Sequence, residues 1–339
     1  MFCNEYKEMS FSDIADNSYY RIHGRTEADE NGLRLSWSNS GIEFLFNGNR
    51  AELHFGESFA DQPYYVKVFI DKGQQKYCID GKSPKILLDC QRNTCHHVKA
   101  LLITENNSPL LLKKITIYGK TPEFLPKPED KKLKLEFMGD SITAGFGVVA
   151  AKDQDTFYTY EEDSTQTYAF LTAEKLDADL RTICVSGQGV WKNCAGETGY
   201  RFEKIFDMSL RAKDGYDHSA WQPDVMILNC GTNDVPGKTT EEIMYTEGSA
   251  LIDKVRKAYP KAHIIWMYGM MNSKFTETLD RLVADKRREG DDKIHFLHVD
   301  EIYSQKNEVG AIGHPNVNAS VRVSGILSRY IANLLNIER

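Results

Sequence analysis

The sequence lacks a hydrophobic run that could cross a bilayer, which takes about 20 apolar residues. Its first stretch, residues 1–17 (MFCNEYKEMSFSDIADN), has a polar or charged side chain every few positions, so the apolar core of a secretory signal peptide is missing. A disulfide framework is also missing, because the seven cysteines are odd in number and several stand singly within predicted strands. We therefore expect a cytoplasmic protein with reduced thiols and no membrane partner.

The chain also carries more negative than positive charge. The formal net charge is −7, and this argues against a general nucleic-acid binder, which needs a basic face for phosphates. Apolar residues make up 41% and charged residues 27% of the chain, an ordinary balance for a globular protein. A length of 339 residues suits two domains of about 150 residues each. None of this indicates an oligomeric state.

The first third of the chain reads as β-strands joined by turns, and it predicts a β-sandwich of jelly-roll type over residues 1–120. Asn47-Gly48 lies between two strand-like runs and indicates a hairpin, and Asp71-Lys72-Gly73 is a weaker signal of the same kind. Three prolines in the segment from Thr121 to Pro128 break any central strand or helix, so residues 121–131 are predicted to be a linker. The expected strands are 41–46, 51–55, 64–70, 85–88, 98–103 and 112–118.

From residue 132 to 339 the pattern alternates between strands and helices. Five strands that alternate with helices predict a three-layer α/β/α domain with a parallel five-stranded sheet. Ligands of such sheets bind beyond the carboxyl ends of the strands. The expected strands are 133–138, 180–185, 224–229, 263–268 and 294–299, and the expected helices are 166–176, 240–258, 276–288 and 318–335.

Ser141 follows the first of these strands in Phe137-Met-Gly-Asp-Ser-Ile-Thr143. A serine at a helix N-terminus lies among unpaired backbone N–H groups that favour developing negative charge, which suits a nucleophile. The alternative is that Asp140 or Ser141 only caps the helix, since both residue types are preferred caps. The spacing Gly-x-Ser-x-Gly is absent here, which disfavours an ordinary α/β-hydrolase.

Three further candidates follow later elements. Gly187, in Cys184-Val-Ser-Gly-Gln-Gly189, either offers a backbone N–H to an oxyanion or forms a turn. Asn233, after the third strand, either donates its amide to the same oxyanion or forms an Asx-turn. His314, just before the last helix, is either a proton shuttle or a structural histidine. Each signal is weak alone, but four in this order at the ends of successive elements are informative.

Gly139-Asp-Ser141, Gly187, Gly231-x-Asn233 and His314 resemble the four motif blocks of the SGNH (GDSL-type) hydrolase superfamily over residues 133–337. The preceding β-domain and Gly313-His-Pro-Asn316 look more narrowly like carbohydrate esterase family 2, whose members deacetylate plant-polysaccharide sugars. The resemblance implies that Ser141 attacks the ester and His314 takes its proton. It also implies an oxyanion hole made of the Ser141 and Gly187 N–H groups and the Asn233 side chain, with no metal and no cofactor.

The sequence departs from the superfamily pattern at one position. An aspartate usually stands three residues before the histidine, and here that residue is Ala311. Family 2 often works with a Ser–His dyad whose imidazole is held by a backbone carbonyl, and we adopt that interpretation for His314. Asp300, at the end of the fifth strand, is the less favoured substitute. An orienting group is needed because the ring must present the correct tautomer to the serine.

Other chemistry-bearing residues are given structural interpretations. Cys90, Cys95, His96 and His97 do not complete a zinc site, because adjacent histidines of a strand point to opposite faces. Packing is also favoured over ligation for His295 and His298. Asp140 and Asp234 are interpreted as hydrogen-bonding braces.

Trp191 is a candidate sugar-stacking residue. An acidic stretch with interleaved aromatics either walls the sugar site or is a solvated insertion; its residues are Asp153, Asp155, Phe157, Tyr158, Tyr160, Glu161, Glu162 and Asp163.

We therefore predict an O-acetyl esterase for acetylated manno- or xylo-type oligosaccharides that works through an acetyl-serine intermediate. One alternative is a glycan-binding protein that uses aromatic residues of the β-domain, such as Trp37, Tyr64 and Tyr65. Another is a thioesterase or lysophospholipase with the same hydrolytic groups. The sequence does not identify the sugar or the acetylated hydroxyl.

Overall fold

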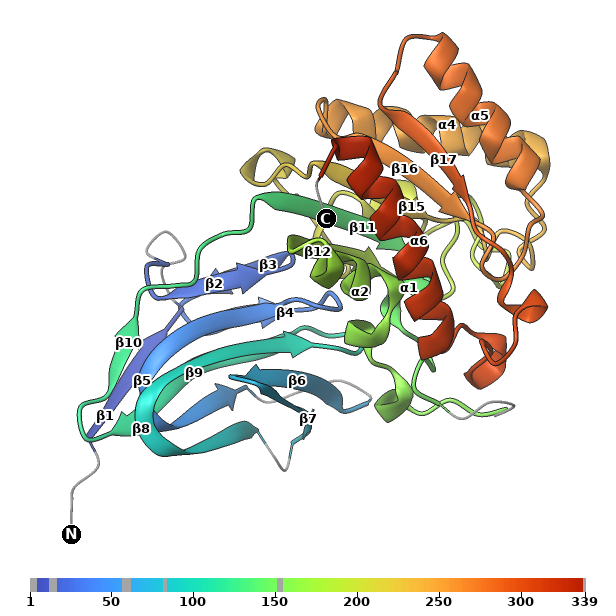
Figure 1. The fold of residues 1–339 in the computed structure, drawn as a ribbon. Helices are drawn as coiled ribbons and strands as arrows, with labels where there is room; N and C mark the ends of the chain where they lie inside the picture. The colour runs from blue at the N-terminus through green and yellow to red at the C-terminus, as the bar shows by residue number, and fades with distance from the viewer. Residues whose placement is uncertain (1–4, 12–16, 57–61, 82–83, 151–154, 338–339) are drawn as a thin grey trace. The chain divides into compact units, whose positions relative to one another are not determined.

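The computed structural model describes residues 5–11, 17–56, 62–81, 84–150 and 155–337 (Figure 1). The chain divides into two compact units. The first unit is Met1–Asp130 together with Ser209–Arg211, and the second is Lys131–Met208 with Ala212–Arg339. Among the described residues, no helix combines the length and the apolar character that a membrane span requires.

The first unit is a strand-rich domain built on one ten-stranded sheet. Every pairing within this sheet is antiparallel. Seven strands follow the order β3-β4-β9-β5-β8-β6-β7, while β1 joins β9 and both β2 and β10 join β5. The strands are β1 (Glu5–Ser10), β2 (Tyr20–His23), β3 (Thr26–Asp29), β4 (Gly32–Leu35), β5 (Gly41–Phe55), β6 (Tyr64–Ile70), β7 (Gly73–Ile79), β8 (Lys85–Leu102), β9 (Leu110–Gly119) and β10 (Glu123–Leu125).

The hairpin predicted at Asn47-Gly48 is wrong, because β5 runs through both residues as one strand. Neither residue has the positive φ that a two-residue hairpin turn requires. Instead the pairing register with β8 shifts between Gly48 and Arg50, which marks a bulge. Glycine is needed at this point because a Cβ on Gly48 would lie 2.5 Å from the Tyr118 carbonyl oxygen of β9. The runs predicted as separate strands at 85–88 and 98–103 are likewise one strand, β8.

The weaker hairpin signal is correct. Strands β6 and β7 pair from Ile70 and Gly73 outward, which leaves Asp71 and Lys72 as the two turn residues. Asp71 has a φ of 50°, the left-handed conformation that aspartate tolerates in such turns. Side chains that alternate along β5 and β6 fill the core of this unit, and they include Ile42, Phe44, Phe46, Val66 and Val68.

The predicted linker at residues 121–131 contains a short strand. Glu123–Leu125 forms β10 and pairs with β5 through Phe124 and Phe46. Pro122 and Pro126 flank it, which is compatible with a three-residue strand at a sheet edge. The first unit therefore continues beyond residue 120.

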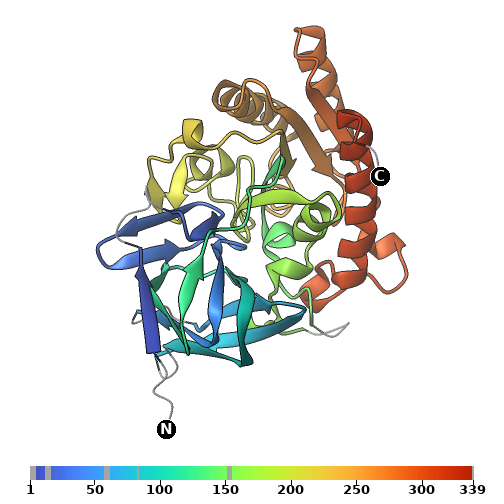
Figure 2. The ribbon, with the colours of Figure 1, turned by 60° about the vertical axis from the view of Figure 1, so that its left-hand side comes forward.

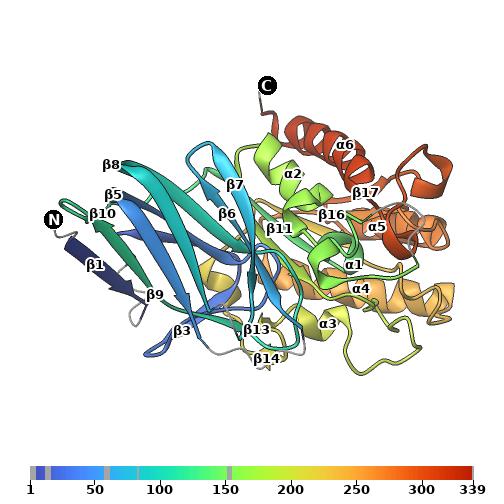
Figure 3. The same cartoon turned by 90° about the horizontal axis from the view of Figure 1, so that it is seen from below.

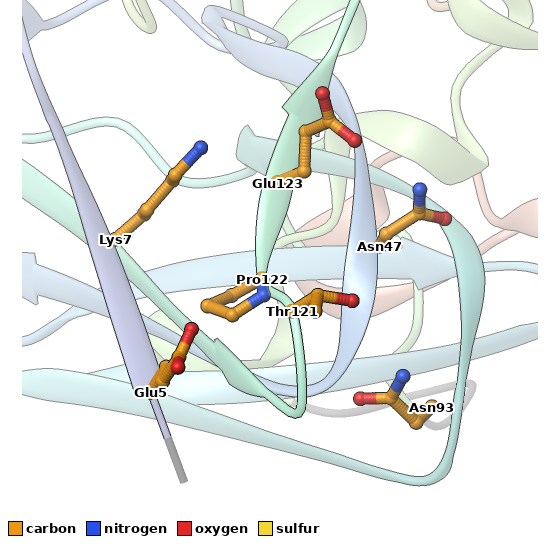
Figure 4. A pocket seen from close by; sticks show the side chains of 7 residues that line it. All are labelled: Glu5, Lys7, Asn47, Asn93, Thr121, Pro122 and Glu123. Atoms are coloured by element: carbon orange, nitrogen blue, oxygen red, sulfur yellow. The ribbon is translucent and has the colours of Figure 1, made fainter.

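A polar groove of about 470 Å³ opens in the first unit beside β10 (Figure 4). Glu5 and Lys7 reach it from β1, and Asn47 and Asn93 reach it from β5 and β8. Thr121, Pro122 and Glu123 complete its lining. The groove thus contains no aromatic side chain among its lining residues.

The second unit has the predicted architecture. Its five parallel strands follow the order β12-β11-β15-β16-β17. Helices α2 and α6 lie on one face of this sheet, and α4 and α5 lie on the other (Figure 3). The sheet strands are β11 (Leu133–Gly139), β12 (Ala178–Cys184), β15 (Val225–Asn229), β16 (His263–Tyr268) and β17 (Ile294–His298).

The helices of this unit are α1 (Ser141–Ala144), α2 (Tyr168–Lys175), α3 (Phe202–Ile205), α4 (Glu241–Ala258), α5 (Thr276–Arg288) and α6 (Val317–Leu335). Two short strands, β13 (Met208–Leu210) and β14 (Lys213–Asp214), pair with each other. Short 3₁₀ helices are present at Thr159–Glu161, Ser164–Gln166, His218–Ala220, Ile302–Ser304 and Ala311–Gly313. The α-helix predicted at 166–176 is shorter than expected, because its beginning is partly 3₁₀.

The strand order has a topological switch point where the site was expected. After β11 the chain crosses to β12 on one side and then returns to β15 on the other side of β11. This reversal makes the carboxyl ends of β11 and β15 a topological switch point, the usual ligand position in open α/β sheets. Ser141 follows β11 and Asn233 follows β15, so both fall at this point. Figure 2 shows the last helix of this unit, α6, in red.

Candidate active site

Ser141 is the first residue of α1 and follows β11. The sequence left open whether Ser141 is a nucleophile or only caps this helix, and the hydrogen bonds of its neighbours bear on that choice. Asp140 is the helix cap, because its Oδ1 accepts a hydrogen bond from the Ile142 backbone N–H at 3.0 Å. Ser141 is therefore not needed as a cap. The turn also requires Gly139, since a Cβ there would lie 2.1 Å from the Thr143 Oγ1.

His314 lies beside this serine, although 173 residues separate them in the chain. Its Nε2 is 2.9 Å from the Ser141 Oγ, and its Nδ1 is 3.0 Å from the Ile312 carbonyl oxygen. A carbonyl can only accept, so the proton must sit on Nδ1. The lone pair of Nε2 is then left to accept the serine proton, which is the tautomer that a general base requires.

The Ile312 carbonyl is therefore the orienting group, and the sequence did not indicate which carbonyl would serve. Ile312 has φ 48° and ψ 43°, a left-handed conformation that is unfavourable for a β-branched side chain. This conformation directs its carbonyl back toward the imidazole two residues later. Asp300 does not take this role, because His314 Nδ1 is already bonded to Ile312.

The structure also explains the missing aspartate. Ala311 is fully buried, and a Cβ added to Gly147 would come within 2.7 Å of the Ala311 Cβ. A carboxylate at position 311 would thus be desolvated in a space that is already filled. The dyad held by a backbone carbonyl fits this packing, and an aspartate at position 311 does not.

Several contacts hold the loop that carries His314. Tyr303 donates its hydroxyl to the Gly313 carbonyl at 2.8 Å. Asn316 caps α6 by accepting from the backbone N–H groups of Asn318 and Ala319. Arg322 of α6 makes a two-pronged ion pair with Glu308, with both N···O distances at 2.7 Å. The loop is therefore fixed from both sides of the histidine.

The expected oxyanion donors lie at neighbouring strand ends. Gly187 follows β12 with a φ of +79°, a conformation that favours glycine. The Asn233 Nδ2 donates to the Gln188 carbonyl at 2.9 Å and to the Asp140 Oδ2 at 3.2 Å. The first of these bonds ties Asn233 to the Gly187 loop. The second is the longer, so a substrate oxygen would take its place most easily.

Asp234 braces the same region, in agreement with its interpretation as a structural residue. Its buried carboxylate accepts hydrogen bonds from three successive backbone N–H groups and from the Thr239 hydroxyl, at distances of 2.6 to 3.0 Å. The three N–H groups belong to Val190, Trp191 and Lys192. This carboxylate therefore shapes the loop that continues from Gly187.

Aromatic rings stand next to the histidine. The Phe146 ring lies 4.6 Å from the His314 ring, and Phe157 stacks on Phe146 at 3.7 Å. Tyr158 and Tyr160 stack on each other at 5.4 Å, and each is about half exposed. The neighbouring Glu161, Glu162 and Asp163 are buried, whereas Asp155 is exposed, so only the later part of this stretch is packed into the unit; Asp153 lies outside the described residues.

Trp191 has one ring face covered, because the Arg201 guanidinium lies 4.6 Å from its centroid. Its backbone N–H is one of the Asp234 donors, so the ring is attached to a braced loop. A sugar-stacking role for Trp191 stays a prediction.

Three of the histidines that were set aside have protein partners. His96 bonds to Asp71, and His97 bonds to Glu43, from opposite faces of β8 as expected. His295 bonds to His263 on the neighbouring strand. Within the part of the chain that the structure describes, no three His, Cys, Asp or Glu side chains are grouped to hold a metal ion.

Burial lowers the pKa of His314 below the ordinary value of 6.5, and its hydrogen bonds to the Ile312 and Ala311 backbone partly offset this effect. The base must be neutral to accept the Ser141 proton, so activity falls as His314 becomes protonated. We expect the acid limb of kcat/KM for a small acetyl ester to lie below pH 6.5. A pH–rate profile measures it. An acid limb above neutral pH would contradict the backbone-carbonyl orienter and indicate a carboxylate partner.

A neutral imidazole that can take a proton from a serine hydroxyl is the chemistry of a serine ester hydrolase. The comparison with known families agrees with this class. Residues 137–306 match the GDSL-like lipase/acylhydrolase family, and the chain belongs to that family. Residues 22–128 match the N-terminal domain of carbohydrate esterase family 2.

Two curated relatives cover most of the chain. The cellulase/esterase CelE of Acetivibrio thermocellus is 26% identical over 94% of this chain, but the chain spans only 40% of the length of CelE. An acetylxylan esterase/glucomannan deacetylase of Cellvibrio japonicus is 25% identical, over 81% of this chain and 78% of its own length.

One solved structure has the same architecture over both units. The family two carbohydrate esterase from Clostridium thermocellum, in complex with cellohexaose, has a TM-score of 0.82 and 25% identity. The match covers 94% of this chain and 99% of that chain. The strand-rich first unit and the five-stranded parallel sheet of the second are thus the fold of carbohydrate esterase family 2.

Proposed function

We propose that this protein is a carbohydrate O-acetyl esterase that removes acetyl groups from acetylated manno- or xylo-type oligosaccharides. The observation that carries the proposal is the 2.9 Å contact between His314 Nε2 and Ser141 Oγ, with the imidazole held in the tautomer of a base. The names of the curated relatives, an acetylxylan esterase and a cellulase/esterase, support an ester of a plant polysaccharide as the substrate.

In the first half of the proposed reaction, the Ser141 Oγ attacks the acetyl carbonyl carbon and its proton passes to His314 Nε2. The carbonyl oxygen becomes an oxyanion, which the Ser141 and Gly187 N–H groups and the Asn233 amide stabilise. When the tetrahedral intermediate collapses, the sugar oxygen leaves and takes the proton from His314. Ser141 then carries the acetyl group.

In the second half, water attacks the acetyl-serine and gives its proton to His314. The new oxyanion occupies the same donors, and its collapse releases acetate. The proton on Nε2 returns to the Ser141 oxygen. The enzyme is thereby restored, and no metal or organic cofactor enters either half.

The glycan-binding alternative loses the residues on which it was based. Trp37 and Tyr64 are fully buried, and the Trp37 Nε1 donates to the Ser209 carbonyl within the first unit. The Tyr65 ring has the Lys76 ammonium 4.9 Å from its centroid, and Tyr65 also has partners beyond this one. These three aromatics do not form an exposed platform for sugars.

The preferred acyl group distinguishes the proposed acetyl esterase from the thioesterase or lysophospholipase alternative. We expect kcat/KM to fall sharply from acetyl to butyryl and longer nitrophenyl esters, because an acetyl esterase needs room for only one methyl group. NMR of partially acetylated xylan and mannan oligosaccharides during turnover then reports which hydroxyls lose acetate. A preference for long acyl chains, with no acetate released from either glycan, would refute the proposal.

A further inference from the structure

The turn that carries His314 has a strained backbone. Ile312 has φ 48° and ψ 43°, and the next residue, Gly313, has φ +68°, so two consecutive residues are left-handed. Glycine adopts this conformation freely, whereas a β-branched residue such as isoleucine adopts it at a cost. Such a conformation persists only where the surrounding structure holds it. The Ile312 side chain supplies little of that support, because it is 47% exposed.

Backbone bonds close the base of this turn. The Gly310 N–H donates to the His314 carbonyl at 2.7 Å, and the His314 N–H donates to the Ala311 carbonyl at 3.0 Å. Val309 and Pro315 pair as an antiparallel bridge on either side of these bonds. The base is therefore fixed, but none of these contacts uses the two carbonyl groups at the tip of the turn.

Side chains hold those two carbonyls. The Ile312 carbonyl is 3.0 Å from the His314 Nδ1, and the Gly313 carbonyl accepts from the Tyr303 hydroxyl at 2.8 Å. The carbonyls belong to consecutive peptide groups that meet at the Gly313 Cα. Glycine by itself does not fix the angle between two peptide planes, because it tolerates a wide range of φ and ψ. A hydrogen bond that fixes the second plane thus restricts the first.

Tyr303 is anchored independently of the turn. It lies on the short 3₁₀ helix Ile302–Ser304, where Ile302 is fully buried and donates its backbone N–H to the Met270 carbonyl at 2.9 Å. Burial and the Glu301 carboxylate raise the pKa of Tyr303 above its ordinary value of 10. The phenol therefore keeps its proton below pH 10 and remains a hydrogen-bond donor there.

The imidazole of His314 depends on the direction of the Ile312 carbonyl. The ring packs against Phe146 at 4.6 Å, and its Nε2 faces the Ser141 Oγ at 2.9 Å. Because the Ile312 carbonyl can only accept, it keeps the proton on Nδ1 and leaves Nε2 free to act as a base. If Ile312 left its left-handed conformation, the carbonyl would turn away. A proton on Nε2 would then no longer be disfavoured.

We propose that Tyr303 is a positioning residue for the dyad: its hydroxyl holds the Gly313 carbonyl and so keeps the Ile312 carbonyl directed at His314 Nδ1. The inference rests on the proposed function, in which His314 is the general base of both half-reactions. Tyr303 acts through the backbone of the turn and takes no part in bond making or proton transfer.

The kinetic test is Tyr303→Phe, which removes the hydroxyl and keeps the ring. It should lower kcat for nitrophenyl acetate about 3- to 10-fold, the range for one lost hydrogen bond, with KM changed by less than about twofold. Tyr245→Phe is the matched control and should leave both constants unchanged. That hydroxyl also donates, to Asp285 at 2.7 Å, but it joins α4 to α5. A higher KM with an unchanged kcat would overturn the positioning role.

A second variant tests the strain directly. Asparagine adopts the left-handed conformation more readily than isoleucine, and position 312 is exposed, so Ile312→Asn should keep the turn with less need of Tyr303. In that background we expect Tyr303→Phe to lower kcat by less than about twofold. An equal loss in the two backgrounds would mean that Tyr303 does not act through the turn.

NMR of the histidine rings separates failure of this inference from failure of the proposed function, because it needs no substrate. With isotope-labelled histidine, the His314 signals are identified by their loss in His314→Ala. Wild-type protein should show a protonated Nδ1 and an unprotonated Nε2. Faster exchange of the Nδ1 proton and a larger share of the other tautomer in Tyr303→Phe support the role even if acetyl esters are not hydrolysed. Identical His314 signals in wild type and Tyr303→Phe refute it even in an active acetyl esterase.

Discussion

Replacing Ser141 by alanine is expected to lower kcat for acetyl ester hydrolysis by about 10⁴- to 10⁶-fold, the scale seen when a serine nucleophile is removed. The hydroxyl lies 2.9 Å from the His314 Nε2. Without it, the enzyme has no oxygen to carry the acyl group. The fold should persist, because Asp140 and not Ser141 caps α1. Acetate release and far-UV circular dichroism measure the two effects.

His314→Ala should cause a comparable loss, and the double variant should lose little more, because the two groups act as one unit. Ser219→Ala is the matched control. That serine lies on the 3₁₀ helix before β15, where its hydroxyl bonds to Asp217, and so at the opposite end of the strand from Asn233. Losses that multiply in the double variant, or turnover that survives in Ser141→Ala, would rule out the dyad.

Replacing Asp234 by alanine is expected to lower the free energy of unfolding by about 3 to 5 kcal/mol. The carboxylate is fully buried and accepts four hydrogen bonds, so its removal leaves three backbone N–H groups and the Thr239 hydroxyl without an acceptor. The loop between Gly187 and Lys192 should also shift. Urea unfolding gives the stability, and kcat measured on the folded fraction gives the effect on the oxyanion donors.

Asp217→Ala is the control for this second prediction. Asp217 also accepts from a backbone N–H and a hydroxyl, both of Ser219, but it does so at an exposed position. Water can replace its hydrogen bonds, so the change in unfolding free energy should be well under that of Asp234→Ala. Equal effects of the two substitutions would mean that Asp234 does not brace the loop as the structure indicates.

Local patterns predicted most elements of the second unit. The strand at His263–Tyr268 and the helix at Thr276–Arg288 have the predicted bounds, because apolar periodicity and flanking polar residues mark both ends of each. The first unit was harder. Gly48 was read as a turn signal, yet its role is a close approach to Tyr118, a residue 70 positions away. Periodicity within one strand does not report such an approach.

The sequence by itself determined the order of the chemistry: a serine after one strand, a glycine after the next, an asparagine after the third and a histidine before the last helix. Parallel strands place all their carboxyl ends at one edge, so that order was sufficient to predict a shared site. Only the tertiary structure decided which group holds His314. The answer depends on the left-handed conformation of Ile312 and on the packing of Gly147 against Ala311, and backbone direction and filled space are properties of the folded chain.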